Sequence, residues 1–369
     1  PALEGSPLQL SIDLSTQAAT RQVLEDGMRF TNAKGASAIL MDIHTGEILS
    51  LVSLPDFDPN NRLRDVVSGD ASDSPLFNRA AQGLYELGST FKIFTAAISL
   101  EKGLANPQTI IDTTPFRWNR KTFRDYRDYG PSNTMEDVIM KSSNPGTIRM
   151  ALAAGSSAQQ SILKSLGFFE ALPVELIEAG GTKPQLPKNW SDSSTITISF
   201  GHGLSATPLH LATAYSIISN GGYKIKPTLQ LLKPDNLKGK KIISEKTSKQ
   251  LISMLRRVVT GGTASMGDVK GYEVAGKTGT ADKPSPKGGY YDDKVIATFA
   301  SVFPASNPKY TLIVSLDEPV VHISGKKRRT AGYTAVPVAA EIISRVAPIL
   351  NLRPIVANLQ VTYTSLNSQ

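Results

Sequence analysis

Strand-like segments lie at both ends of this 369-residue chain, and a long stretch of helical character separates them. Residues 37–53 contain two apolar runs joined by a glycine-containing turn, a pattern that predicts a β-hairpin. Residues 272–281, 295–304 and 310–319 also alternate with a period of two. We therefore expect one antiparallel sheet built from the two ends of the chain, which makes the predicted fold class α+β.

Helical periodicity characterises the middle of the chain. The expected helices cover residues 16–30, 89–103, 147–155, 157–168, 207–222, 244–260 and 334–350, with a short helix that opens at Thr134. Residues 8–15 alternate well enough for a further strand. We expect a sheet subdomain from residues 8–80 and 262–350 and a helical subdomain over 81–261, with the active crevice between them.

The composition restricts the kind of site that the chain can hold. There are no cysteines, which excludes disulfides, thiolate metal sites and cysteine nucleophiles. The four histidines are too scattered to suggest a metal cluster. The net charge of +8 favours contact with polyanions. The basic run at 325–329 lacks interleaved aromatic residues, however, and fits a solvated loop better than a nucleic-acid site.

We recognise no signal peptide in this sequence. No apolar run approaches about 18 residues, so a membrane span is not expected. The sequence begins at Pro1 without an initiator methionine, and we expect a processed or trimmed fragment of a longer protein. Residues 351–369 form a tail that runs past the last expected helix without a motif.

Five serines are followed by a lysine three residues later, so the pattern Ser-x-x-Lys alone says little. They are Ser89, Ser99, Ser161, Ser306 and Ser324. Among the five lysines, Lys92 alone lies within an apolar helix, where burial would lower the pKa of its amine and let it accept the Ser89 proton. Gly88 permits the close approach of another backbone. Ser89 then falls at the helix N-terminus, where free N–H groups favour a developing negative charge. The alternative is a capping serine with Lys92 reaching to water.

A second motif, Ser-Ser-Asn at residues 142–144, carries polar groups suited to the same chemistry. The hydroxyl of Ser142 can relay a proton, and the amide of Asn144 can hold a substrate carbonyl. A capped turn is the structural alternative, and Ser-x-Asn also occurs in the tail.

A third motif, Lys-Thr-Gly-Thr, occurs once, at residues 277–280. On a strand, Lys277 and Gly279 would share one face, and Thr278 and Thr280 the other. The missing side chain at Gly279 lets another group approach, and a strand edge can pair with an extended peptide. Lysine and threonine groups suit a carboxylate. An ordinary strand with a glycine bulge is the alternative.

The three motifs, in this order, resemble those of penicillin-recognising serine acyltransferases. Longer segments also look like the transpeptidase domain of penicillin-binding proteins, among them NRAAQGLYELGSTFK, SSNPGT, SFGHGLSATPLHLATAYSIISNGG and AGKTGTA. The resemblance spans most of residues 8–345 and has the style of class B, division-specific (FtsI-type) septal transpeptidases. It implies the transpeptidase fold shared with serine β-lactamases, an antiparallel sheet packed against a large helical subdomain.

The resemblance also implies a reaction, peptidoglycan D,D-transpeptidation through a serine acyl-enzyme. Ser89 would attack the penultimate D-Ala carbonyl of a stem peptide, with Lys92 as its base. Ser142, assisted by Lys277, would pass the proton to the leaving D-Ala. β-Lactams would mimic D-Ala-D-Ala and leave an acyl-enzyme that hydrolyses slowly.

The remaining site residues follow from the same resemblance. Asn144 would orient the acyl-side amide, and Thr278 and Thr280 would bind the carboxylate beside Gly279. The backbone N–H groups of Ser89 and Thr280 would form the oxyanion hole. No metal and no cofactor are implied.

The resemblance places the full-length protein in the cell envelope, at the periplasmic face of the inner membrane. Its single-pass anchor and its N-terminal non-catalytic module would lie outside this chain. The implied partners are stem peptides on nascent glycan strands, β-lactams, and division or elongation proteins that include a glycosyltransferase; nucleic acid is not expected.

Three further residues lie near the motifs. Leu87 and Pro145 stand where relatives often carry proline and a small aliphatic residue, so entry into the helix and the Ser-Ser-Asn turn could be altered. His202 lies in a segment that lines the crevice in relatives, and both a structural role and a conformational or substrate-contact role stay open.

Two other functions stay open. A serine β-lactamase would share the fold, but no Glu-x-x-Leu-Asn stretch lies between the second and third motifs. A catalytically silent β-lactam sensor or division scaffold is disfavoured because the motif residues are intact.

Overall fold

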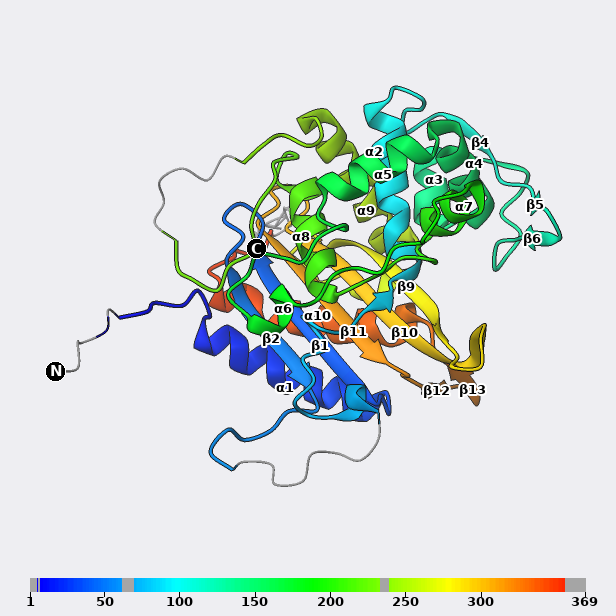
Figure 1. Cartoon of the computed structure of the whole chain (residues 1–369). Helices are drawn as coiled ribbons and strands as arrows, with labels where there is room; N and C mark the ends of the chain where they lie inside the picture. Colours follow the sequence, from blue (N-terminus) through cyan, green and yellow to red (C-terminus); the bar gives the residue numbers. More distant parts are fainter. Residues whose placement is uncertain (1–4, 6, 62–69, 233–238, 356–369) are drawn as a thin grey trace, which may run out of the picture.

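A five-stranded antiparallel sheet forms the centre of the protein (Figure 1). The computed structural model describes residues 5, 7–61, 70–232 and 239–355. In order across the sheet the strands are β2 (Ile48–Leu54), β1 (Gly35–Asp42), β11 (Tyr310–Asp317), β10 (Tyr290–Phe303) and β9 (Ala275–Pro284). Strands from the two ends of the chain lie side by side, which confirms the predicted α+β sheet.

The pairing of β1 with β11 joins the two ends of the chain. The register runs from Gly35 opposite Asp317 to Asp42 opposite Tyr310. Nearly every residue of both strands is buried, so neither shows the polar alternation of a strand with one solvated face. Helices must therefore cover both faces of the sheet.

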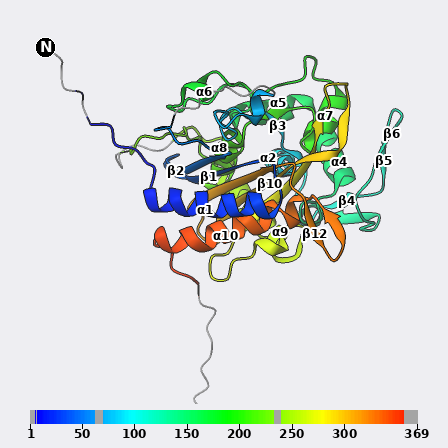
Figure 2. The same ribbon diagram turned by 90° about the horizontal axis from the view of Figure 1, so that it is seen from below.

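Two terminal helices cover one face, and a central helix covers the other (Figure 2). The terminal helices, α1 (Leu14–Phe30) and α10 (Ala335–Ile349), are in close contact, since a β-carbon on Gly27 would lie 2.6 Å from Val338. On the opposite face, every residue of α8 (Pro208–Ser219) is buried, as expected for a helix enclosed between the sheet and other helices.

The middle of the chain supplies the remaining helices. They are α2 (Lys92–Glu101), α3 (Met135–Lys141), α4 (Asn144–Ala154), α5 (Ser156–Ser165), α6 (Ile177–Gly180), α7 (Asp192–Ser199) and α9 (Glu245–Gly261). Thr134 caps α3 as predicted, because its Oγ1 accepts the N–H of Asp137 at 3.2 Å. The boundaries given above for a sheet and a helical subdomain remain a proposal.

In the described part of the chain, short strands form four two-stranded ladders outside the main sheet. The pairs are β3 (Tyr85–Glu86) with β8 (Ser205–Ala206), β4 (Ile110–Asp112) with β7 (Ser132–Thr134), β5 (Phe116–Trp118) with β6 (Lys121–Phe123), and β12 (Val321–Ile323) with β13 (Lys326–Arg328). The basic run at 325–329, predicted as a loop, therefore contains a strand. The β3–β8 pair matters for function, because β3 leads directly to Ser89.

The strand predicted over residues 8–15 is wrong. Leu10 makes an isolated bridge to Gln230, and α1 already begins at Leu14. The carboxylate of Asp13 accepts the N–H of Thr16 at 2.7 Å, so a helix cap interrupts the alternating pattern. The tail lies outside the described residues from residue 356 on. None of the described helices meets the requirements of a membrane span.

Candidate active site

Ser89 lies in a tight turn that leads from β3 into α2. Residues Gly88–Phe91, which we call the Ser89 turn, form a 3₁₀ helix, and the α-helix begins at Lys92. The helix thus starts three residues later than predicted. Thr90 and Phe91 are buried, whereas Ser89 is partly exposed. Ser89 is therefore the polar residue of this turn that a substrate can reach.

Lys92 points into the protein and is completely buried. Its Nζ donates hydrogen bonds to Ser142, at 2.5 Å to the backbone O and 3.1 Å to Oγ. Among the described residues, no hydrogen bond joins Lys92 to Ser89. Burial lowers the pKa of Lys92 from 10.5 to about 7, and the charge of Asp125 opposes this shift. The amine thus has the pKa of an effective base at neutral pH.

Lys277 approaches the same serine from the sheet. It is completely buried, and its Nζ donates to Ser142 Oγ at 2.9 Å. Burial, and in addition the positive charge of Lys92, lower the pKa of Lys277 well below 10.5. Two buried ammonium groups on one hydroxyl repel each other strongly, which favours states with at least one neutral amine. Residues of all three sequence motifs therefore meet around Ser142.

Ser142 has a backbone conformation that serine rarely adopts. It ends α3 in the left-handed region, with φ 63° and ψ 41°, at a cost of roughly 1–2 kcal/mol. Ser143 then caps α4 by accepting the N–H of Gly146 at 3.2 Å, and Pro145 lies in the first turn, where no N–H is required. The α3–α4 junction thus holds Ser142 in contact with both lysines, and Pro145 is accommodated in the first turn of α4.

Asn144 opens α4 and is partly exposed. Its backbone N–H donates to Oδ1 of Asp125 at 2.7 Å. This carboxylate, which also opposes the pKa shift of Lys92, was not among the predicted site residues. The sequence pattern offered no reason to select it from the irregular segment after β6.

The edge strand β9 carries the Lys-Thr-Gly-Thr motif and packs against the Ser89 turn. A β-carbon on Gly279 would lie 2.3 Å from the backbone O of Leu87, and one on Gly88 would lie 2.9 Å from the backbone O of Thr280. The close neighbour predicted for Gly279 is therefore the protein's own backbone just before Ser89. Glycine at both positions lets the turn and the strand approach each other this closely.

The two threonines of the motif follow the alternation that was predicted for a strand. The hydroxyls of Thr278 and Thr263 share a hydrogen bond of 2.7 Å, and Oγ1 of Thr280 accepts the N–H of Ala331 at 3.0 Å. An acceptor role leaves the Thr280 hydroxyl hydrogen free to donate. In the Thr263–Thr278 pair, one hydroxyl donates to the other, and the hydrogen of the accepting hydroxyl stays available.

A family model described as penicillin binding protein transpeptidase domain matches residues 36–344. The chain belongs to the penicillin-binding protein transpeptidase family. The probable peptidoglycan D,D-transpeptidase FtsI of Caulobacter vibrioides is 35% identical over 360 residues, which cover 95% of this chain and 60% of that protein. The chain thus spans about 60% of the length of this curated relative.

Solved structures agree with this assignment. The apo transpeptidase domain of penicillin-binding protein 3 from Burkholderia pseudomallei has a TM-score of 0.83 and 29% identity, over 96% of this chain and 100% of that one. Penicillin-binding protein 3 from Mycobacterium tuberculosis, complexed with aztreonam, has a TM-score of 0.83 and 28% identity, over 95% and 81%. The predicted transpeptidase fold and the likeness to FtsI-type proteins are confirmed.

Glu86, which the sequence did not single out, clamps the Ser89 turn of this transpeptidase domain. Its Oε1 accepts the N–H of Gly203 at 2.6 Å and the hydroxyl of Tyr290 at 3.1 Å. The N–H of Gly88 donates to the O of Gly201 at 3.1 Å, in the same glycine-rich turn. Glu86 thus links the approach to Ser89 with the 201–203 turn and with β10.

We expect Glu86→Ala to slow acylation by penicillin about tenfold, because loss of one buried hydrogen-bonding group of this kind costs about 1–3 kcal/mol. Glu86→Gln keeps the accepting oxygen and should retain most of the rate. Stopped-flow acylation with matched melting temperatures checks this. Equal rates for Glu86→Ala and the unchanged protein would show that the clamp does not position the turn.

His202 lies beside this clamp. Its ring centroid is 6.0 Å from that of Tyr290 and 5.3 Å from that of Phe200. Burial lowers the pKa of His202, although the negative charge of Glu86 opposes the shift, so the imidazole is neutral at pH 7. Its Nδ1 is buried without a hydrogen-bond partner among the described residues. These contacts favour a structural role for His202, packed against Phe200 and Tyr290.

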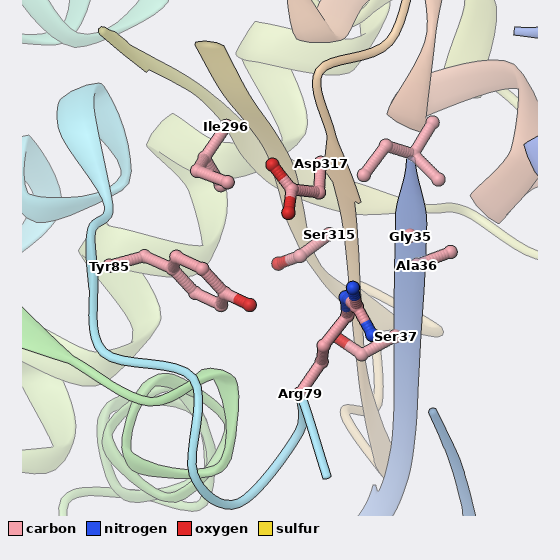
Figure 3. Close-up of a pocket in the computed structure, with 9 residues that line it drawn as sticks. Gly35, Ala36, Ser37, Arg79, Tyr85, Ile296, Ser315 and Asp317 are labelled. Atoms are coloured by element: carbon pink, nitrogen blue, oxygen red, sulfur yellow. The ribbon is translucent and has the colours of Figure 1, made fainter. Parts of the chain in front are cut away.

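A separate small cavity of about 10 Å³ lies where β3 approaches the sheet (Figure 3). The side chains of Arg79, Tyr85 and Asp317 point into it, and it has room for about one water molecule. Arg79 is buried, and its Nε and Nη1 have no partner among the described residues. None of the motif residues lines this cavity, whose walls come from Arg79 and from residues of β1, β3, β10 and β11.

Proposed function

We propose that this chain is the catalytic domain of a peptidoglycan D,D-transpeptidase that acts through a Ser89 acyl-enzyme and is inhibited by β-lactams. The observation that supports this most is the meeting of two buried lysines, Lys92 and Lys277, at the hydroxyl of Ser142, since Lys92 follows Ser89 by only three residues. The names of the relatives agree: one is called a probable D,D-transpeptidase, and another holds the β-lactam aztreonam.

In the proposed acylation, neutral Lys92 accepts the proton of the Ser89 hydroxyl while Oγ attacks the penultimate D-Ala carbonyl carbon. As the tetrahedral intermediate collapses, the C–N bond to the terminal D-Ala breaks. The proton passes from Lys92 through Ser142, with Lys277 assisting, to the departing nitrogen. The hydrogen bonds from both amines to Ser142 Oγ support this path.

The backbone N–H groups of Ser89 and Thr280 would stabilise the oxyanion. The close approach of Gly88 to Thr280 supports this role, because it places both segments against one another. Each such donor contributes about 3 kcal/mol to transition-state stabilisation. Asn144 would hold the acyl-side amide of the stem peptide.

The terminal carboxylate of the donor peptide would be bound by Thr278 and Thr280. The hydroxyl hydrogen of Thr280 is available to donate, and that of Thr278 is available when Thr263 is the donor within their pair. The free edge of β9 at Gly279 would pair with the extended peptide. An amine from a second stem peptide then attacks the ester carbonyl, loses its proton to the same relay, and releases Ser89 as the free hydroxyl.

The similarity to FtsI supports a role in septal wall synthesis, with elongation as the alternative. The full-length protein would be anchored at the periplasmic face of the inner membrane and act on stem peptides of nascent glycan strands. Division or elongation proteins, including a glycosyltransferase, would be its partners.

The proposal separates cleanly from its two alternatives by experiment. Purified protein is given a thioester mimic of the donor peptide together with a D-amino acid acceptor, and penicillin labelling is followed in parallel. We expect the acceptor to be incorporated and the penicilloyl-enzyme to persist for minutes. Labelling without transfer would indicate a silent sensor or scaffold, and turnover of penicillin within seconds would indicate a β-lactamase.

A further inference from the structure

A basic arm projects from the helical side of the protein, close to the active site. We call residues 116–129, which contain β5 and β6, the basic hairpin; it extends beyond α4 and α7 (Figure 1). Its exposed cations are Arg117, Arg120, Lys121, Arg124 and Arg127. Tyr126, in the same segment, is 86% exposed. Five positive charges and an exposed ring thus share one short arm.

These positive charges have no ion-pair partner among the residues that the structure describes. None of the five forms an ion pair with any residue that the structure describes. The two acids of the hairpin are engaged by backbone instead: Asp125 accepts the N–H of Asn144 at 2.7 Å, and Asp128 that of Gly130 at 2.9 Å. Nearby Arg149, by contrast, pairs with Asp112 at 2.9 Å. Five cations against two carboxylates leave the hairpin with a net positive charge, and a bound anion would relieve the repulsion among the cations.

The hairpin is held firmly at its base. The rings of Phe116 and Trp118 are stacked with centroids 6.4 Å apart, and Phe123 contacts Phe200 at 5.8 Å. These rings pack against a small apolar cluster formed by α4 and α7, separate from the main core. The cations are therefore presented from a fixed support, which lowers the entropic cost of binding.

The base of the hairpin adjoins the proposed catalytic residues. Asp125 binds the backbone of Asn144, the last residue of the Ser-Ser-Asn motif. Phe200, which contacts Phe123, immediately precedes the 201–203 turn that touches Gly88. A long substrate bound at Ser89 would therefore lie near this arm.

We propose that the basic hairpin binds the polymeric substrate, a glycan strand whose stem peptides carry carboxylates. The guanidinium groups would pair with those carboxylates, and the exposed ring of Tyr126 would pack on a sugar face. This inference rests on the proposed function and adds a binding site for the polymer outside the catalytic centre. The hairpin would raise affinity for polymeric substrate without changing the chemistry at Ser89.

The test compares two triple variants of equal charge. One is Arg117→Gln/Arg120→Gln/Lys121→Gln, and the control is Lys246→Gln/Lys270→Gln/Lys309→Gln, which neutralises three exposed lysines at other places. Co-sedimentation with purified peptidoglycan is measured from low to high salt, and penicillin acylation is measured in parallel. We expect the hairpin variant to bind about tenfold more weakly at low salt, with a shallower salt dependence, and the control to bind normally.

The outcomes are distinguishable from those that test the proposed function. Unchanged peptidoglycan binding by the hairpin variant, or an equal loss in the control, would overturn the site. A loss of binding to phosphatidylglycerol vesicles with peptidoglycan binding retained would assign the hairpin to an anionic membrane surface and equally overturn it. Penicillin acylation should be the same in both variants, and its absence from the unchanged protein would contradict the proposed function alone.

Discussion

Ser89→Ala is expected to abolish covalent labelling by penicillin while the fold stays intact. Removal of Oγ removes the atom that forms the ester, so the acylation rate should fall by at least about 10³-fold. Ser89 is partly exposed, so the loss of its hydroxyl leaves no large cavity in the core. Labelling with a fluorescent penicillin, followed by gel electrophoresis and mass spectrometry, measures the result.

The chain offers a matched control for this substitution. Ser161 is also followed by a lysine three residues later, but it is exposed on α5. Ser161→Ala should label as fast as the unchanged protein, and both variants should keep its melting temperature within about 2 °C. Labelling of the Ser89→Ala protein would show that another residue is the nucleophile.

The architecture was predictable where the sequence pattern extends over a whole element. The runs that became β1, β2, β10 and β11 contain extended apolar stretches, and the run that became β9 alternates with a period of two, so one common sheet could be expected. The error at residues 8–15 has a local cause, since Asp13 caps α1 inside an alternating pattern too short to compete with it. A side-chain cap of this kind overrides weak periodicity.

The candidate site was predictable in its residues and less so in its contacts. Lys92 could be selected because burying an ammonium group in an apolar helix costs free energy unless the group has a partner or a function. Its hydrogen-bond partner proved to be Ser142, whose left-handed conformation depends on how α3 and α4 pack. Glu86 was missed because its partners, Gly203 and Tyr290, are far away in the sequence.

Lys92→Met is expected to remove activity and to stabilise the protein. Loss of the base should slow acylation by about 10²–10⁴-fold. In the unchanged protein the folded-state pKa of Lys92 is about 7, against 10.5 ordinarily. Between pH 7 and 10.5, Lys92 is protonated in the unfolded chain but neutral in the folded protein. The free energy of unfolding therefore rises with pH over this range because of Lys92. Acylation should rise through about pH 7 as the amine becomes neutral.

The methionine variant should therefore exceed the unchanged protein in unfolding free energy by about 1–3 kcal/mol at pH 7, since apolar replacement of a buried charge is often stabilising. The difference should shrink as the pH approaches 10.5. Urea unfolding at several pH values measures it, with Lys102→Met, an exposed lysine just after α2, as the control. A methionine variant that is less stable at pH 7, or equally active, would mean that Lys92 is a buried structural cation rather than the base that serves Ser89.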